Sequence, residues 1–148
     1  MFKHILVPVD GSDLFRAAVN HACSFARDAG ARLTFYHAKP SYMPYGMAAE
    51  GVFDYVGASE AFRNTMDKQA DAILASAKQA ADDAGVACAT LTTECDSPYE
   101  GIIATAESQA CDLIFMASHG RGGARALLLG SETLKVLTHC KIPVLVYR

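Results

Sequence analysis

The chain has 148 residues, enough for one domain of ordinary size. Hydrophobic residues make up 51% and charged residues 20%, a globular composition that excludes a disordered tail or a charge-driven scaffold. The net charge of −3 argues against a general nucleic-acid binder, which needs a clustered basic surface. No apolar run approaches the ~18 residues of a membrane span, and the amino terminus reaches Asp10 too soon for a signal peptide. We expect one soluble, cytoplasmic domain over residues 1–148.

Cysteine usage agrees with that location. The number of cysteines is odd, and no two of them have the C-x-x-C spacing of a zinc or redox site. They are interpreted either as small apolar residues of a reducing compartment or as including a reactive thiol. The histidines show no H-x-x-x-H pairing, so a metal held by protein ligands is not expected. The five cysteines are Cys23, Cys88, Cys95, Cys111 and Cys140.

The first half of the chain begins with a strand and a helix. His4–Val9 is apolar at successive residues, which is typical of a strand covered on both faces of a parallel sheet. Apolar residues then recur at helical spacing from Ala18 to Ala29, and Gly30 ends this helix. Arg32–Ala38 is the second expected strand.

A long connection, Lys39–Gly57, is expected next, with several aromatic residues and methionines. A loop of this length in a compact domain is usually functional or disordered. Two interpretations stay open: a lid or partner surface, or a connection whose apolar residues fold back on the second helix. That helix is predicted from Phe62 to Ala81, with a stop at Gly85.

The second half of the chain repeats the alternation. Val86–Thr93 is the third expected strand, and Ser97-Pro98-Tyr99-Glu100 predicts a capping box with proline at the first helical position. Asp112–Ala117 follows as a further apolar strand, a fourth helix begins near Ser131, and Ile142–Tyr147 is the last strand.

This order of elements predicts an α/β fold. With right-handed crossovers it forms an open, doubly wound, five-stranded parallel sheet between two helical layers, a three-layer α/β/α sandwich. Pro143 lies within the last expected strand, and proline in a strand indicates an edge. Because a bare apolar edge invites pairing with another chain, we expect a homodimer through residues 142–147.

Two strand ends carry residues suited to binding an anion. The first strand ends in Pro8-Val9-Asp10-Gly11-Ser12, and a glycine-rich loop leads from the fourth strand to the helix at Ser131. Ligands of such sheets bind beyond the carboxyl ends of the strands, where the winding reverses. A glycine-rich loop at a helix N-terminus offers backbone N–H groups to phosphate, and Arg121 and Arg125 add positive charge. The loop is neither a P-loop nor a dinucleotide fingerprint, since Gly-Lys-Ser/Thr and G-x-G-x-x-G are both missing.

The arrangement resembles the universal stress protein family over essentially the whole chain. The residues that carry the resemblance are I-L-V-P-V-D-G-S near the amino terminus and S-H-G-R-G-G-A-R-A-L-L-L-G-S, followed by K-V-L-T-H and I-P-V-L-V. The nucleotide-binding branch of that family has a glycine, two residues, a glycine, nine residues, then glycine and Ser or Thr. Gly120 and Gly130-Ser131 match this motif, and Ala117 replaces its first glycine.

The resemblance implies a Rossmann-like fold, similar to that of the adenine nucleotide alpha hydrolases, with ATP or another adenine nucleotide bound between the loops after the first and fourth strands. It implies that Asp10 holds the ribose or base end, that the backbone around Ala38 meets adenine, and that the amide of Glu132 joins the phosphate cradle. Mg²⁺ or Mn²⁺ is then held mainly by phosphate oxygens, and the last strand pairs across a two-fold axis. The expected nucleotide-contacting residues are Pro8, Val9, Asp10, Ala38, Ala117, His119, Gly120, Arg121, Gly123, Gly130, Ser131 and Glu132.

Several of these residues also have a purely structural interpretation. Asp10 is suited to capping the first helix, Ser131 is an N-cap in either case, and a lone loop histidine such as His119 is often just solvated. At Ala117, a requirement for positive φ costs about 1–2 kcal/mol, whereas a requirement for smallness costs almost nothing. The Glu132 carboxylate either lies beside the phosphates or points to solvent and favours the helix dipole.

The sequence therefore favours a small ATP-binding regulatory or protective protein of the stress response. No nucleophile–base pair is evident from spacing, so no fast enzymatic activity is expected, at most very slow hydrolysis or autophosphorylation. The alternative is a nucleotide-free dimeric interaction protein, which the Ala117 departure and the aromatic connection favour. An adenylating enzyme ranks third, because H-I-G-H and S-G-G-x-D-S motifs are missing.

Overall fold

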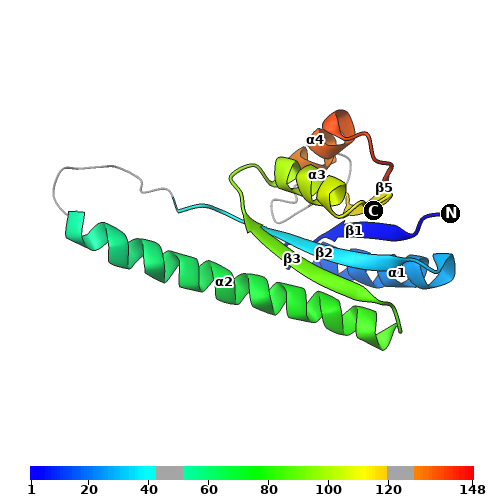
Figure 1. Cartoon of the computed structure of the whole chain (residues 1–148), viewed down its shortest axis with the longest axis horizontal. Coiled ribbons are helices and arrows are strands. Elements are labelled where there is room, and N and C mark those ends of the chain that lie inside the picture. The colour runs from blue at the N-terminus through cyan, green and yellow to red at the C-terminus, as the bar shows by residue number, and fades with distance from the viewer. Residues whose placement is uncertain (43–51, 120–128) are drawn as a thin grey trace.

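The structure, a computed structural model, describes residues 1–42, 52–119 and 129–148, with the side chains of residues 52–56 left aside. The five strands are all parallel and lie in the order β3-β2-β1-β4-β5, which confirms the predicted open sheet. The elements in chain order are β1 (His4–Pro8), α1 (Asp13–Ala29), β2 (Arg32–Lys39), α2 (Val52–Asp83), β3 (Cys88–Glu94), α3 (Pro98–Ser108), β4 (Leu113–Ala117), α4 (Ser131–His139) and β5 (Val144–Tyr147) (Figure 1).

Helices cover both faces of the sheet, α1 and α2 on one side and α3 and α4 on the other (Figure 1). Successive side chains of a strand point to opposite faces, so the three inner strands β1, β2 and β4 supply two layers of core. In β1, Ile5 packs in the cluster with α1 and α2, whereas Leu6 packs in the cluster with α3 and α4. Phe115 and Ile114 divide in the same way in β4. This two-sided burial explains why the strands read as continuous apolar runs.

The second helix begins earlier than predicted, at Val52 rather than Phe62. Lys39 also belongs to β2, where it pairs with Glu94 of β3, so the predicted connection Lys39–Gly57 is too long at both ends. Residues 57–69 of α2 are exposed or half-buried, and its first buried residue is Ala70. Apolar periodicity missed this part of the helix because it runs beyond the sheet, as Figure 1 shows.

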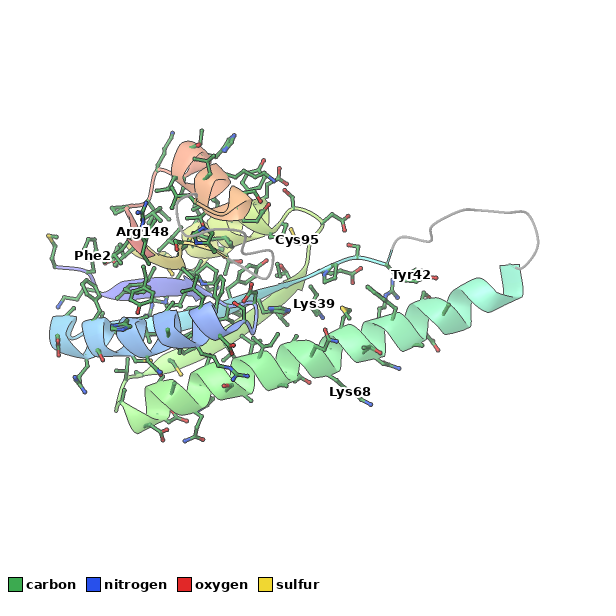
Figure 2. The ribbon with its side chains drawn as sticks, turned by 180° about the vertical axis from the view of Figure 1, so that it is seen from behind. Phe2, Lys39, Tyr42, Lys68, Cys95 and Arg148 are labelled. Carbon is green, nitrogen blue, oxygen red and sulfur yellow. The ribbon has the colours of Figure 1, made fainter. Side chains whose placement is uncertain are left out.

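The start of the connection lies against α2. The ring centroids of Tyr42 and Phe62 are 5.3 Å apart, and Lys39 Nζ lies 2.5 Å from Asp67 Oδ1 (Figure 2). For Tyr42 the fold-back interpretation is therefore correct. The other residues that suggested a lid or partner surface either lie outside the described residues or have side chains left aside; they are Met43, Pro44, Tyr45, Met47, Phe53 and Tyr55.

The predicted capping box at α3 is wrong, although the helix begins where expected. The Ser97 side chain makes no capping hydrogen bond, and the Glu100 carboxylate accepts the Tyr99 hydroxyl at 3.0 Å instead. A carboxylate from another helix takes over, because Glu132 Oε2 accepts the Tyr99 backbone N–H at 2.8 Å. A tertiary contact has thus replaced the local motif.

Two strands begin two residues later than predicted. β3 begins at Cys88 rather than Val86, and β5 begins at Val144, so Pro143 precedes the strand instead of lying within it. β5 is nevertheless an edge strand, as predicted. Within the described residues, no helix is long and apolar enough to span a membrane.

Burial favours the thiol form of three of the five cysteines. All five are free thiols. Burial raises the pKa of Cys23 and of Cys111 to about 11, and it also raises the pKa of Cys88. Because the thiolate is the reactive form, these three side chains are held in their unreactive state.

Candidate functional site

The candidate site lies at the edge of the sheet where the parallel strands end. β1 lies between β2 and β4, and Pro8 is in register with Tyr36 at the carboxyl end of the β1–β2 pair. The chain leaves β1 through α1 on one face, whereas it leaves β4 through α4 on the opposite face (Figure 1). The winding therefore reverses between β1 and β4, where sheets of this kind bind their ligands.

The loop after β1 is fixed by hydrogen bonds to β2 and to itself. Val9 is 5% exposed; its N–H donates to the Tyr36 carbonyl at 2.8 Å, and its carbonyl accepts His37 Nδ1–H at 2.7 Å. Asp10 Oδ1 accepts the Ser12 N–H at 2.9 Å, which closes a turn just before α1. This bond forms a turn before the helix and is not the helix cap that the structural interpretation gave to Asp10, since the N-cap residue of α1 is Ser12. Ala38, half-buried in β2, lies on the same edge of the sheet.

The end of β4 is joined directly to the start of α4. The Gly130 N–H donates to the Ser118 carbonyl at 2.7 Å, and Thr133 Oγ1 donates to the Ala117 carbonyl at 3.0 Å. The prediction that Ser131 is the N-cap is wrong, because Ser131 is the first helical residue and Gly130, which offers no side chain, is the N-cap. The first helical bond runs from Leu134 N–H to the Gly130 carbonyl at 3.0 Å. The N–H groups that precede Leu134 therefore have no helical partner and suit an anion.

Each of the two loops also holds a buried polar atom that has no hydrogen-bond partner among the residues that the structure describes. His119 Nδ1 lies 2.9 Å from Ser118 Oγ, but no described residue pairs with its buried Nε2. Ser12, the N-cap residue of α1, has no side-chain capping bond, and its buried Oγ is likewise without a described partner. An unpaired buried polar group costs about 1–3 kcal/mol, so a polar ligand that satisfies these atoms is favoured at this edge.

Ala117 is the last residue of β4 and is 1% exposed. Among the non-glycine residues that the structure describes, positive φ occurs at Ala110 and not at Ala117. The backbone therefore does not require glycine at this position, and the methyl group packs in the core with α1 and α2. Of the two expectations for Ala117, a requirement for smallness is the one that fits.

The Glu132 carboxylate does not point freely to solvent. Oε2 accepts the Tyr99 N–H at 2.8 Å and Oε1 accepts Lys135 Nζ at 2.9 Å, so both oxygens are engaged. The solvent-facing alternative for this side chain is wrong. The tertiary contact with α3, 33 residues away in the chain, has no counterpart in the local sequence pattern.

The structure brings Pro8, Val9, Asp10 and Ala38 to the same edge as Ala117, His119, Gly130, Ser131 and Glu132. Gly120, Arg121 and Gly123, together with Arg125, lie outside the described residues. The sequence did not single out Ser12 as a ligand-facing residue, or Thr133 as the residue that joins α4 to β4. Ser12 was visible in the sequence as a possible cap, whereas no sequence signal pointed to the bond from Thr133.

Comparison with known proteins decides the family. The model of the universal stress protein family matches residues 1–148. The chain belongs to this family. A universal stress protein of Thermus aquaticus is 34% identical, and universal stress protein YxiE of Bacillus subtilis is 30% identical, with all of this chain and all of each relative covered.

Solved structures share the fold. Protein MJ0577 of Methanocaldococcus jannaschii, itself a universal stress protein, has a TM-score of 0.81 and 26% identity, over 99% of this chain and 95% of its own. A universal stress protein in complex with cAMP has a TM-score of 0.71 and 22% identity, over 99% of this chain and 97% of its own. A universal stress protein from Archaeoglobus fulgidus in complex with dAMP has a TM-score of 0.64 and 19% identity, over 99% of this chain and 98% of its own. At these identities the last two establish the fold alone.

Proposed function

We propose that this universal stress protein binds an adenine nucleotide, with ATP as the first candidate, at the sheet edge between β1 and β4. The observation that carries the proposal is the start of α4. It has a glycine N-cap and N–H groups without helical partners, and it is joined to the end of β4 through Gly130 and Ser118. Such an N-terminus favours phosphate through its N–H groups and its dipole.

The residues fit such a ligand on both sides of the edge. The phosphates lie beside Gly130, against the amides of Ser131 and Glu132, while the Gly130 N–H keeps its bond to the Ser118 carbonyl; Mg²⁺ or Mn²⁺ is held by phosphate oxygens. His119 Nε2 and Ser12 Oγ, buried without described partners, supply further hydrogen bonds to the ligand. The proposal places the ribose or base near Asp10 and Ala38, and it extends the cradle through Gly120, Arg121 and Gly123.

The proposed role is regulatory or protective rather than enzymatic. The nucleotide acts as a signal or stabiliser of the folded chain in the stress response, without rapid turnover. Relatives of this fold have been solved with cAMP and dAMP, which makes adenine nucleotides the ligand class to test first. The five free cysteines agree with a location in the reducing cytoplasm.

A second copy of this chain is the proposed partner. β5 is an edge strand of four apolar or aromatic residues, and all four side chains are half-buried rather than buried. The proposed homodimer pairs β5 of one copy with β5 of the other, which covers this edge.

Two measurements test nucleotide binding. Denaturing the purified protein releases any nucleotide that is retained from the cell, and chromatography identifies it. Calorimetry with Mg-ATP then compares the parent with Gly130→Val, whose side chain shields the amides at the start of α4. Gly130 has φ −58° and ψ 149°, so valine is compatible with this backbone and the fold is retained.

Gly57→Val is the matched control, because a Cβ at Gly57 meets no atom within 4 Å. We expect the parent and the Gly57 variant to bind Mg-ATP alike and the Gly130 variant to lose binding. Equal affinity of the parent and Gly130→Val would show that the site lies elsewhere.

A further inference from the structure

Glu132 caps a helix other than its own. It lies in the first turn of α4, where an acidic side chain ordinarily favours its own helix N-terminus. Here its Oε2 accepts the N–H of Tyr99 in the first turn of α3, at 2.8 Å. α3 has no side-chain cap from Ser97, so Glu132 supplies this contact.

The second oxygen is held as well. Glu132 Oε1 lies 2.9 Å from Lys135 Nζ, one turn further along α4 and thus away from its N-terminus. Lys135 Nζ also lies 5.4 Å from the centroid of the Tyr99 ring, and that ring is 5.2 Å from the ring of His139. These contacts join the first turn of α3 to α4 along one side.

We infer that Glu132 is a positioning residue of the phosphate site. Because its carboxylate binds α3, the first turn of α4 is anchored. The same contact keeps the negative charge of the carboxylate from competing with the ligand. The inference rests on the proposed nucleotide binding and adds a role for the side chain, since that proposal uses the Glu132 backbone amide alone. A carboxylate free to turn toward the N–H groups of α4 occupies the place of the phosphate or repels it. An α4 without the link to α3 loses the fixed geometry of those N–H groups.

Two substitutions at Glu132 distinguish the effect of its negative charge from the effect of its hydrogen bond to α3. Glu132→Gln retains an oxygen that accepts the Tyr99 N–H and removes the charge, so ATP affinity stays within about threefold of the parent. Glu132→Ala removes the link, so affinity for ATP and for inorganic tripolyphosphate, both with Mg²⁺, falls roughly fivefold or more. Adenosine has no phosphate, and its affinity stays the same in both variants.

Asp82→Ala is the matched control, because it removes a carboxylate that is likewise paired with a lysine of its own helix, Lys78, but lies on α2 and away from α3 and α4. We expect it to bind ATP like the parent. Calorimetry gives the affinities, and thermal unfolding measured in parallel shows that each variant is folded.

Three outcomes overturn the inference. Tighter, salt-dependent ATP binding by Glu132→Ala shows a carboxylate that merely repels phosphate. An equal loss of ATP and adenosine binding in that variant shows a general structural defect. A parent protein that binds neither ATP nor tripolyphosphate overturns the proposed function together with this inference, whereas the first two outcomes leave the proposed function standing.

Discussion

Ala117 stands where the nucleotide-binding motif of the family has glycine, and its surroundings indicate how much this matters. Its backbone belongs to β4, without positive φ, and its carbonyl accepts Thr133 Oγ1 at 3.0 Å. We therefore expect Ala117→Gly to change Mg-ATP affinity by no more than about twofold. The variant is also less stable by roughly 0.5–1 kcal/mol, since glycine weakens a strand interior. Parallel titrations of the two proteins check this, and a tenfold gain in affinity would contradict it.

His4 is a buried histidine outside the site, and its hydrogen bonds fix its protonation state. It is 6% exposed; its Nδ1 accepts Arg32 Nη2–H at 3.1 Å, so its Nε2–H donates to Thr34 Oγ1 at 2.7 Å. Burial lowers the pKa of His4 and the nearby Arg32 charge lowers it further, against smaller opposing effects that include Asp112. A proton on Nδ1 would face the Arg32 guanidinium, so the folded state favours the neutral ring.

The lowered pKa of His4 predicts how stability depends on pH. The unfolded chain takes up a proton near pH 6.5 and the folded chain at lower pH, so the unfolded state binds more protons between the two values. Stability is therefore lost as the pH falls below about 6.5. Urea unfolding midpoints measured at several pH values show a smaller loss for His4→Gln than for the parent. The exposed control His139→Gln retains the parental loss, and an unchanged dependence in His4→Gln would refute the assignment to His4.

At the scale of elements, local signals identified which segments form strands and helices. Continuous apolar runs predicted strands covered on both faces, and Gly30 ends α1 in the left-handed conformation, with φ 63°. What the sequence did not reveal depends on tertiary contacts. The bond from Glu132 to Tyr99 spans 33 residues and the bond from Thr133 to Ala117 spans 16, so no local pattern encodes them. The early part of α2 was missed because its described residues, 57–69, are exposed or half-buried and therefore show no apolar periodicity.

Gly101 is a helical glycine whose place in α3 depends on close packing. A Cβ at this position overlaps the Tyr36 hydroxyl oxygen, which is held by a 2.6 Å hydrogen bond to Thr93 Oγ1. Gly101→Ala gains up to about 1 kcal/mol of helix propensity but loses roughly 1–3 kcal/mol to overpacking, so we expect net destabilisation. In Gly57→Ala no atom lies within 4 Å of the new Cβ, so we expect this variant to show the gain in helix propensity without any loss from overpacking. Urea denaturation compares the two variants, and a Gly101→Ala protein as stable as the parent would rule out the steric argument.

At the scale of the whole molecule, the topology explains why the site was predictable as a region. Parallel strands end at one edge, so residues after β1, β2 and β4 converge there although they are distant in the chain. The sequence could therefore place Asp10, Ala38 and Gly130 together from strand order alone. It could not show that Ser12 Oγ and His119 Nε2 are buried without described partners, because burial depends on how the loops pack.

The two edges of the sheet differ in a way that favours one for self-association. β5 reads V-L-V-Y, whereas β3 reads C-A-T-L-T-T-E and carries three threonines and a glutamate. The carbonyls of Pro143, just before β5, and of Tyr147, at its end, accept hydrogen bonds from the N–H groups of Ile114 in β4 and of Ser118 just after it. Because the direction of the backbone groups alternates along a strand, those of Val144 and Val146 point outward. β5 thus offers an apolar edge whose outward backbone groups pair with no other strand in the part of the chain that the structure describes.

The proposed homodimer is tested by removing one of these outward donors. Val146→Pro deletes the N–H at an outward position and leaves the ladder to β4 in place, since edge strands tolerate proline at such sites. Thr90→Pro makes the same change on β3, where the Ala87 carbonyl faces β2 and Thr90 therefore points outward. We expect light scattering to give twice the 15.8 kDa chain mass for the parent and for Thr90→Pro, and the single chain mass for Val146→Pro. A parent mass near 15.8 kDa at every concentration, or a Val146→Pro protein that remains dimeric, would show that β5 does not form the interface.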